Sequence, residues 1–191
     1  MAEKNETNKI SAVLVIAVIL TATVIALRSQ GRVWRHDCGR ILVWVGDAWS
    51  SHTSQHLFDP YSFTHVLHGL AFCGLLALLV PQWSFRWRLC SAVALEAVWE
   101  VFENSAFVIN RYRAATVSLG YQGDSIVNSL GDIAACALGF ALAWRLGWRR
   151  SAVVFLVTEA VLLLWIRDSL LLNVVMLLYP IEAIKIWQLG H

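Results

Sequence analysis

The feature that most constrains this sequence is a series of apolar runs long enough to cross a lipid bilayer. A hydrocarbon core of roughly 30 Å needs about 20 residues of α-helix at 1.5 Å per residue. We therefore expect an all-α polytopic membrane helical bundle of five to six transmembrane helices, forming a single integral membrane domain over residues 1–191. The predicted spans cover residues 10–27, 62–80, 89–109, 125–144 and 151–166.

The C-terminal part of the chain leaves the number of spans open. A continuous helix over residues 151–179 would be more than about 40 Å long, too long for the bilayer. We therefore expect a break near residues 167–173. The residues that follow, 174–188, form either a short sixth span or an interfacial helix.

The composition supports this interpretation. Hydrophobic residues make up 58% of the chain and charged residues 15%, with a mean hydropathy of +0.61. An ordinary soluble domain has roughly 45–50% apolar and about 25% charged residues. The net charge of +2 is spread over the loops, without a basic stripe that could follow phosphates. We expect membrane lipids as partners and no nucleic acid.

The longest polar stretch, residues 28–61, predicts an ordered loop that lies against the membrane. We expect its residues His52, His56 and Asp59 to be solvated. The four cysteines give neither a disulfide framework nor a Cys-x-x-Cys metal knuckle, and three of them lie inside apolar runs. We interpret the cysteines as small core residues.

Three glutamates interrupt the third apolar run. Glu96, Glu100 and Glu103 are spaced i, i+4, i+7, which places them within an arc of about 60° on one helix face. An ionised group at mid-membrane costs roughly 2.5–3.5 kcal/mol, whereas each Leu, Ile, Val or Phe returns about 0.3–0.6 kcal/mol. This face must therefore point into the bundle, where its carboxyl groups share protons or are paired.

Two other runs place polar residues at the same membrane depth. Asp124, Asn128 and Asp132 are spaced i, i+4, i+8, and His65 and His68 are spaced i, i+3 at the start of the second run. In an up-down bundle, these helix ends lie at one membrane face. The sequence therefore predicts one polar chamber there, because lipid cannot solvate such groups. Its predicted members include Glu100, Glu103, Asp124 and His68.

The residue types in this chamber indicate metal or acid/base chemistry. Imidazole and carboxylate ligands suit Zn, Mn or Fe, and we expect a divalent metal, Zn or Mn, as the cofactor. A metal-free alternative remains open, in which crowded carboxyl groups share protons and one of them donates a proton near neutral pH. The predicted roles are catalysis by Glu100, Glu103 and Asp124, substrate binding by Arg111, Arg113 and Asn128, and metal binding by His65, His68, Glu96 and Asp132.

Several strings of the sequence resemble an uncharacterised bacterial membrane-protein family, domain of unknown function 2585. They are CGR at 38–40, YSFTHVLHG at 61–69, WEVFENS at 99–105, RYRAAT at 111–116, GDSIVNSLGD at 123–132, IRDS at 166–169 and PIEAIKIWQ at 180–188. The resemblance covers the chain from about residue 36 to its end. It implies a multi-pass protein of the bacterial inner membrane and carries no activity.

A shorter pattern is similar to VanZ-like membrane proteins, which are associated with glycopeptide-antibiotic resistance. It consists of Asp124, Asn128 and Gly131 at their present spacing, preceded by an arginine and by a glutamate-bearing helix. The sequence departs from that pattern at Glu103, where a glutamine is typical.

Two functions from different classes follow from the predicted chamber. The first is metal-assisted hydrolysis or group transfer on a lipid or an envelope-linked substrate. The second is a non-enzymatic bundle that binds an ion, conducts protons or serves as a docking subunit of a membrane complex. Lys and Arg are balanced between the two sides, so the positive-inside rule does not decide orientation. We expect a cytoplasmic N-terminus and a periplasmic chamber, because the polar loop follows the first apolar run.

Overall fold

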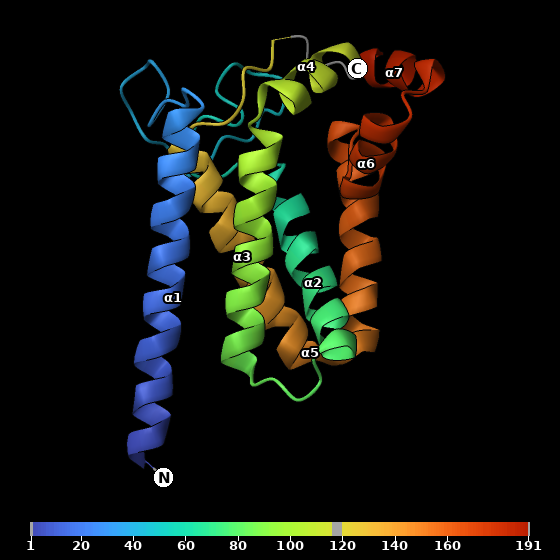
Figure 1. The fold of residues 1–191 in the computed structure, drawn as a ribbon. Helices are drawn as coiled ribbons and strands as arrows, with labels where there is room; N and C mark the ends of the chain where they lie inside the picture. Colours follow the sequence, from blue (N-terminus) through green and yellow to red (C-terminus); the bar gives the residue numbers. More distant parts are fainter. Residues whose placement is uncertain (1, 116–119, 191) are drawn as a thin grey trace.

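The computed structural model describes residues 2–115 and 120–190, and these residues form seven helices (Figure 1). Three of the helices, α1, α2 and α5, contain stretches long and apolar enough to span a membrane. In the described residues, the extended structure is limited to one bridge between Trp44 and Phe58. The helices are α1 (Ala2–Ser29), α2 (Ser62–Leu79), α3 (Phe85–Glu103), α4 (Ala106–Ala115), α5 (Ile126–Ile166), α6 (Leu170–Leu178) and α7 (Glu182–Leu189).

Helix α5 consists of two arms that fold back on each other. Gly147 has a φ of 73° and a ψ of 169°, outside the helical region, and a positive φ is a conformation that glycine adopts without a Cβ penalty. The arms cover residues 126–146 and 148–166. The predicted spans 125–144 and 151–166 left residues 145–150 as their linker, and in the structure Gly147 alone makes the turn. Figure 1 shows the two arms running in opposite directions.

Helix α3 lies among the other long helices and packs on α1, α2 and α5. Its side chains Val93 and Ala97 form a small core with Ile133 of α5, against which α1 packs Ile16 and Leu20. A second apolar core, between α2, α3 and α5, is centred on Leu67 and Phe140. The most polar of the long helices thus has neighbours on several sides.

A very close helix contact lies between α2 and the first arm of α5. A Cβ at Gly69 would overlap the backbone carbonyl of Cys136, and a Cβ at Gly139 would overlap the carbonyl of Val66. Small residues at such positions let two helix backbones approach closely. This contact fixes the relative height of α2 and α5, and hence of the polar residues at their N-terminal ends.

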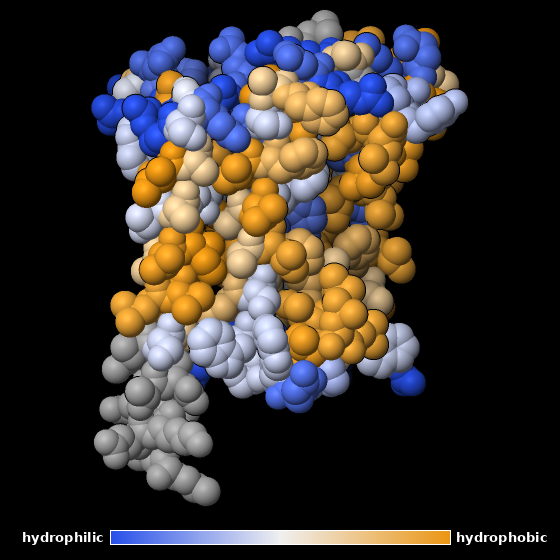
Figure 2. Space-filling view, in the orientation of Figure 1, coloured by the Kyte–Doolittle hydropathy of each residue, from blue (hydrophilic) through white to orange (hydrophobic). Residues whose placement is uncertain are grey.

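The loop between α1 and α2 covers the N-terminus of α5. The first N–H groups of a helix have no partner within the helix. Here Ser125 N donates to Ser54 O at 2.9 Å, Ile126 N to Val33 O at 2.9 Å, and Val127 N to Trp34 O at 3.2 Å. The polar loop is thereby tied to α5. Figure 2 shows hydrophilic residues gathered at this end of the molecule above a largely hydrophobic body.

Several helix ends differ from the sequence prediction: α1 begins at Ala2 rather than at residue 10, and α3 begins at Phe85 rather than at residue 89. Helix α3 ends at Glu103, whereas the predicted span continued to residue 109, because the chain bends at Asn104 and restarts as α4. The predicted break after the fifth span is present: Arg167 has a φ of 52°, and Ser169 caps α6. Glu159 accepts hydrogen bonds from Leu170 N and Leu171 N. The segment predicted as one helix over residues 174–188 is instead divided between α6 and α7.

We predict that Gly69→Ala destabilises the fold because its methyl group has no room against α5. Overpacking of this kind typically costs about 1–3 kcal/mol. Gly74 lies in the same helix, and a Cβ added there would meet no atom within 4 Å, so Gly74→Ala should be neutral or stabilising by up to about 1 kcal/mol. Thermal unfolding of both variants in detergent measures the difference, and equal midpoints would contradict the close contact.

Candidate His/carboxylate site

His65 of α2 is the centre of the polar chamber. Its Nδ1 lies 2.5 Å from Glu96 Oε1 and 3.4 Å from Glu100 Oε1, and its Nε2 lies 3.8 Å from Asp132 Oδ2. Glu96 and Glu100 have no exposed surface. One imidazole therefore lies among carboxylates from both α3 and α5.

His68 stands one helical turn along α2 and contacts the same glutamate. Its Nδ1 lies 3.0 Å from Glu96 Oε2. The ion pairs of the chamber carboxylates in the described part of the chain are with histidine. The chamber holds two sets of possible metal ligands, and within each set the donor atoms all lie within 4.8 Å of one another. One set is His65, His68 and Glu96, and the other is His65, Glu100 and Glu103.

Several buried polar atoms in the chamber lack a hydrogen-bond partner among the described residues. They are both carboxylate oxygens of Glu100, Oε2 of Glu103 and Nδ2 of Asn128. A buried polar atom without a partner costs about 1–3 kcal/mol, and more when it is charged. The three carboxylate oxygens therefore have capacity for a cation or for additional protons, whereas Asn128 Nδ2 can only donate to an acceptor.

A second layer lies where α3 ends. Asn104 donates from Nδ2 to Asp124 Oδ2 at 2.8 Å and accepts from Asp124 N at 2.7 Å. Tyr121 donates to Asp124 Oδ1 at 2.9 Å, and Tyr112 donates to Glu103 Oε1 at 3.0 Å. Burial raises the pKa of Asp124, against the lowering effect of the hydrogen bonds from Asn104 and Tyr121.

Sequence reasoning missed Asn104, Tyr112 and Tyr121. The signal for Asn104 was its place directly after the glutamate face, where an asparagine often ends a helix. The two tyrosines carried no such signal, because they lie on α4 and on the segment before α5. Their hydroxyl groups reach the carboxylates only through the way these segments fold over the helix ends.

A cavity of about 690 Å³ opens beside this site. His65, His68, Glu103, Asp124 and Asp132 line it, whereas Glu96 and Glu100 lie behind the histidines and do not line it. The structure thus brings the predicted carboxylates and histidines together in two groups, one that faces the cavity and one beneath it. Asn128 is buried in the first arm of α5 and does not line the cavity.

The predicted substrate-binding arginines lie elsewhere. Arg111 donates to the carbonyls of Leu177 and Leu178 at the end of α6, and Arg113 donates to Tyr121 O. The last carbonyls of a helix lack partners within it and attract a guanidinium. Arg32, in the loop between α1 and α2, lines the cavity instead. The sequence prediction did not include this arginine.

An apolar groove meets the cavity from the side. Phe72, Leu95, Val98 and Phe102 line this groove of about 310 Å³ together with His68 and Trp99. His68 and Trp99 also line the cavity. Val98 is 69% exposed, so the groove opens on the outer, apolar face of α2 and α3.

The comparisons with known proteins place this chain in a family. A family model described as "Protein of unknown function (DUF2585)" matches residues 27–190. The chain belongs to the DUF2585 family. It is 49% identical to a UPF0314 protein of Paracoccus denitrificans over 151 residues, which are 79% of this chain and 78% of the relative. It is 45% identical to UPF0314 protein R03235 of Rhizobium meliloti over 172 residues, which are 90% and 87% of the two chains.

A further relative extends the similarity over nearly the whole chain. A UPF0314 protein of Brucella anthropi is 43% identical over 177 residues, 93% of this chain and 90% of the relative. No solved structure matches. These matches do not bear on the similarity to VanZ-like proteins, which stays a prediction.

Asp168 lines the far side of the cavity and links α5, α6 and α2. Its carboxylate accepts hydrogen bonds from Ser169 N at 2.8 Å and from the Tyr61 hydroxyl at 3.3 Å. Burial raises the pKa of Asp168 to about 7, from an ordinary value of 3.8. In the folded protein this group therefore binds its proton more tightly than in the unfolded chain.

We predict that Asp168→Asn weakens the dependence of stability on pH. A raised folded-state pKa contributes stability that is fully present below about pH 4 and is lost as the pH rises through about 7. The amide that replaces the carboxyl group cannot titrate, so the unfolding midpoint of the variant should fall less between pH 4 and 7 than that of the wild type.

The exposed Asp47 supplies the control for this measurement. Asp47→Asn removes an exposed aspartate of the loop between α1 and α2 without removing a buried carboxyl group. Thermal unfolding across this pH range should give the wild-type slope for Asp47→Asn. The same slope in all three proteins would show that Asp168 does not contribute.

Proposed function

We propose that this protein is a multi-pass enzyme of the bacterial inner membrane. It uses a divalent metal, Zn or Mn, at the His/carboxylate site to hydrolyse or transfer a group on a lipid or an envelope-linked substrate. The observation that carries the proposal is the junction at His68, where a polar cavity lined by metal-ligating side chains meets an apolar groove.

The arrangement of the helices supports five membrane crossings. They are α1, α2, α3 and the two arms of α5. Helix α6 has nine residues and is about 13 Å long at 1.5 Å per residue, too short to cross. Helix α7 lies with α4 at the polar end of the molecule (Figure 1). The periplasmic orientation of this end remains a prediction.

The residues of the chamber fit a divalent metal. His65, His68 and Glu96 would supply two imidazoles and a carboxylate, and Glu100 offers two buried oxygens without hydrogen bonds among the described residues. A divalent ion would offset the excess of carboxylates over histidines. When bound, such a metal polarises a substrate oxygen or activates a water molecule.

The protein's own side chains can handle protons and hold the substrate. Glu103 faces the cavity with Oε2 free of hydrogen bonds in the described part of the chain, while Tyr112 orients its other oxygen. This geometry suits a base that accepts a proton from the attacking water. Arg32 lines the cavity mouth and offers a positive charge to an anionic group of the substrate.

The groove indicates the substrate class. An acyl or isoprenoid chain would lie against Phe72, Leu95, Val98 and Phe102, and its polar end would enter the cavity past His68 and Trp99. A soluble substrate would need no such apolar route. The size of the cavity leaves room for a head group larger than a single phosphate.

We predict that metal binding and turnover depend on the chamber. Glu100→Gln and His68→Gln keep the approximate side-chain size but remove a negative charge and an imidazole. Metal analysis of the purified protein should show a loss of about one Zn or Mn per chain in the double variant relative to the wild type. Mass spectrometry of lipid extracts incubated with protein should show turnover by the wild type and none by the double variant.

Glu182→Gln is the matched control, since Glu182 is an exposed glutamate on α7. It should retain metal and turnover. Unchanged metal content and unchanged lipids in the chamber variant would overturn the proposal. The docking function would be favoured if the wild type shows neither metal nor turnover, and if the double variant loses protein partners that the wild type binds.

We also predict that Val98→Trp blocks the groove. The indole would fill space that a lipid chain needs, so lipid that co-purifies with the wild type should be reduced in the variant. Val153→Trp places the same side chain at another exposed position, 61% exposed on α5, and should leave bound lipid unchanged. Quantitative mass spectrometry of bound lipids decides, and equal lipid content in both variants would exclude the groove as a binding site.

A further inference from the structure

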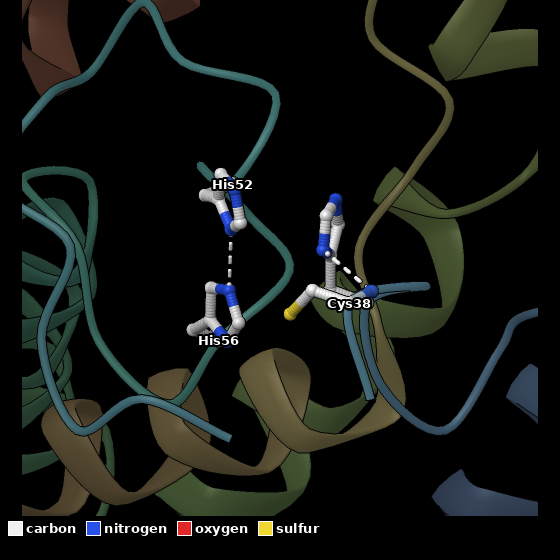
Figure 3. Close-up of side chains that lie close together, drawn as sticks. Cys38, His52 and His56 are labelled. Atoms are coloured by element: carbon white, nitrogen blue, oxygen red, sulfur yellow. Dashed lines mark hydrogen bonds between the residues drawn. The ribbon is translucent and has the colours of Figure 1, made fainter. Parts of the chain in front are cut away.

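Four metal-ligating side chains gather in the loop between α1 and α2, outside the chamber. His36, Cys38, His52 and His56 each offer one ligand atom, and these atoms all lie within 4.8 Å of one another. The ring centroids of His36 and His52 are 4.2 Å apart, and those of His52 and His56 are 5.1 Å apart. Figure 3 shows the Cys38 sulfur directed toward the gap beside the rings of His52 and His56.

Sequence reasoning did not predict this cluster. Cys38 was interpreted as a core residue but is exposed. His56 was expected to be solvated but is 1% exposed. The burial of His56 follows from the folding of the loop, in which Leu42 N donates to His56 Nδ1 and Leu57 N donates to Leu42 O.

We propose that His36, Cys38, His52 and His56 bind a zinc ion that fixes this loop. One thiolate and three imidazoles make a four-donor set of the kind that tetrahedral zinc accepts in structural sites. Zinc–ligand bonds of about 2.0–2.3 Å place the donors about 3.3–3.6 Å apart. Donors that lie 4.8 Å apart need to close by about 1.2–1.5 Å, and His52 Nδ1 and His56 Nε2, now 2.8 Å apart, need to separate by about 0.5 Å. Both changes are within the reach of rotamer adjustments in a loop.

The hydrogen bonds of the cluster show what the ion would replace. His52 Nδ1 and His56 Nε2 are 2.8 Å apart and share a proton, and Cys38 N donates to His36 Nδ1 at 3.1 Å. Leu42 N donates to His56 Nδ1, so the shared proton belongs to His56 Nε2. Ligation through Nε2 would move this proton to Nδ1 and release the backbone hydrogen bond, whereas the thiol proton of Cys38 would be lost to solvent. Because zinc binding releases the thiol proton, it weakens as the pH falls.

The position of the cluster gives the ion a structural role. It would join the 36–38 turn to the 52–56 segment. Both segments lie beside backbone groups that cap α5, because Val33 O and Trp34 O accept from its first N–H groups on one side and Ser54 O accepts on the other. His36 and Ser54 also line the cavity. An ion here would hold the mouth of the cavity and the N-terminus of α5 in place.

The test uses Co²⁺ as a spectroscopic substitute for zinc in the full-length protein. Metal-free protein that carries Glu100→Gln and His68→Gln, and therefore lacks the chamber site, is titrated with Co²⁺ in detergent. We expect one thiolate-to-cobalt charge-transfer band that saturates at one ion per chain and is displaced by Zn²⁺. Cys38→Ala should abolish the band. His52→Ala should weaken Co²⁺ binding by more than the roughly 10–100-fold that loss of an outer-shell partner costs.

Cys136→Ala is the matched control, because Cys136 lies on α5 near the chamber and is buried. It should retain the band, which separates this cluster from the chamber. Zn²⁺ should also raise the thermal unfolding midpoint of the wild type by more than that of Cys38→Ala, which retains the chamber site and whose exposed side chain is not needed for packing. Absence of the band, or a band that survives Cys38→Ala, would overturn the proposal.

Discussion

The burial of Glu96 and Glu100 is the constraint on which the rest of the structure depends. A buried carboxylate is costly unless it is paired or hydrogen-bonded, so α3 must have partners around its glutamate face. Helix α2 supplies His65 and His68, and the first arm of α5 supplies Asp132. The glycine contact between α2 and α5 then matters for chemistry as well as packing. It sets the height at which His65 meets the carboxylates.

Helical periodicity was enough to predict much of this chamber. The spacing of Glu96 and Glu100 predicted one shared face, and the structure directs both toward His65. Periodicity failed where the helices end. Asp124 was assigned to the same helix face as Asn128, but it precedes the Ser125 cap, so its direction is set by Asn104 and Tyr121 rather than by helical rotation. A one-residue shift of a helix start cannot be read from apolar spacing.

The arginines and the loop histidines show a second limit. Sequence alone could not tell whether Arg111 would pair with a carboxylate or with backbone carbonyls, because both are favourable partners for a guanidinium. The outcome depended on where α6 ends, more than 60 residues away along the chain. The burial of His56 was equally hidden from the sequence, because a polar loop without periodicity is expected to be solvated. In the structure, the loop carbonyls accept hydrogen bonds from the first N–H groups of α5, so the loop lies on the bundle and His56 is buried.

The capping of α5 connects the loop to the chamber by a short structural route. The N–H groups of residues 125–127 are held by carbonyls of the loop, and Asp132 lies less than two helical turns further along the same arm. Asp132 also accepts a hydrogen bond from Ser62 at 2.7 Å, at the start of the helix that carries His65. A shift of the loop would therefore move both sides of the His65–Asp132 contact, since its carbonyls accept hydrogen bonds from the first N–H groups of α2 as well as from those of α5. The polar loop that follows the first apolar run is thus a part of the site's framework, and its order bears directly on the geometry of the carboxylates beneath it.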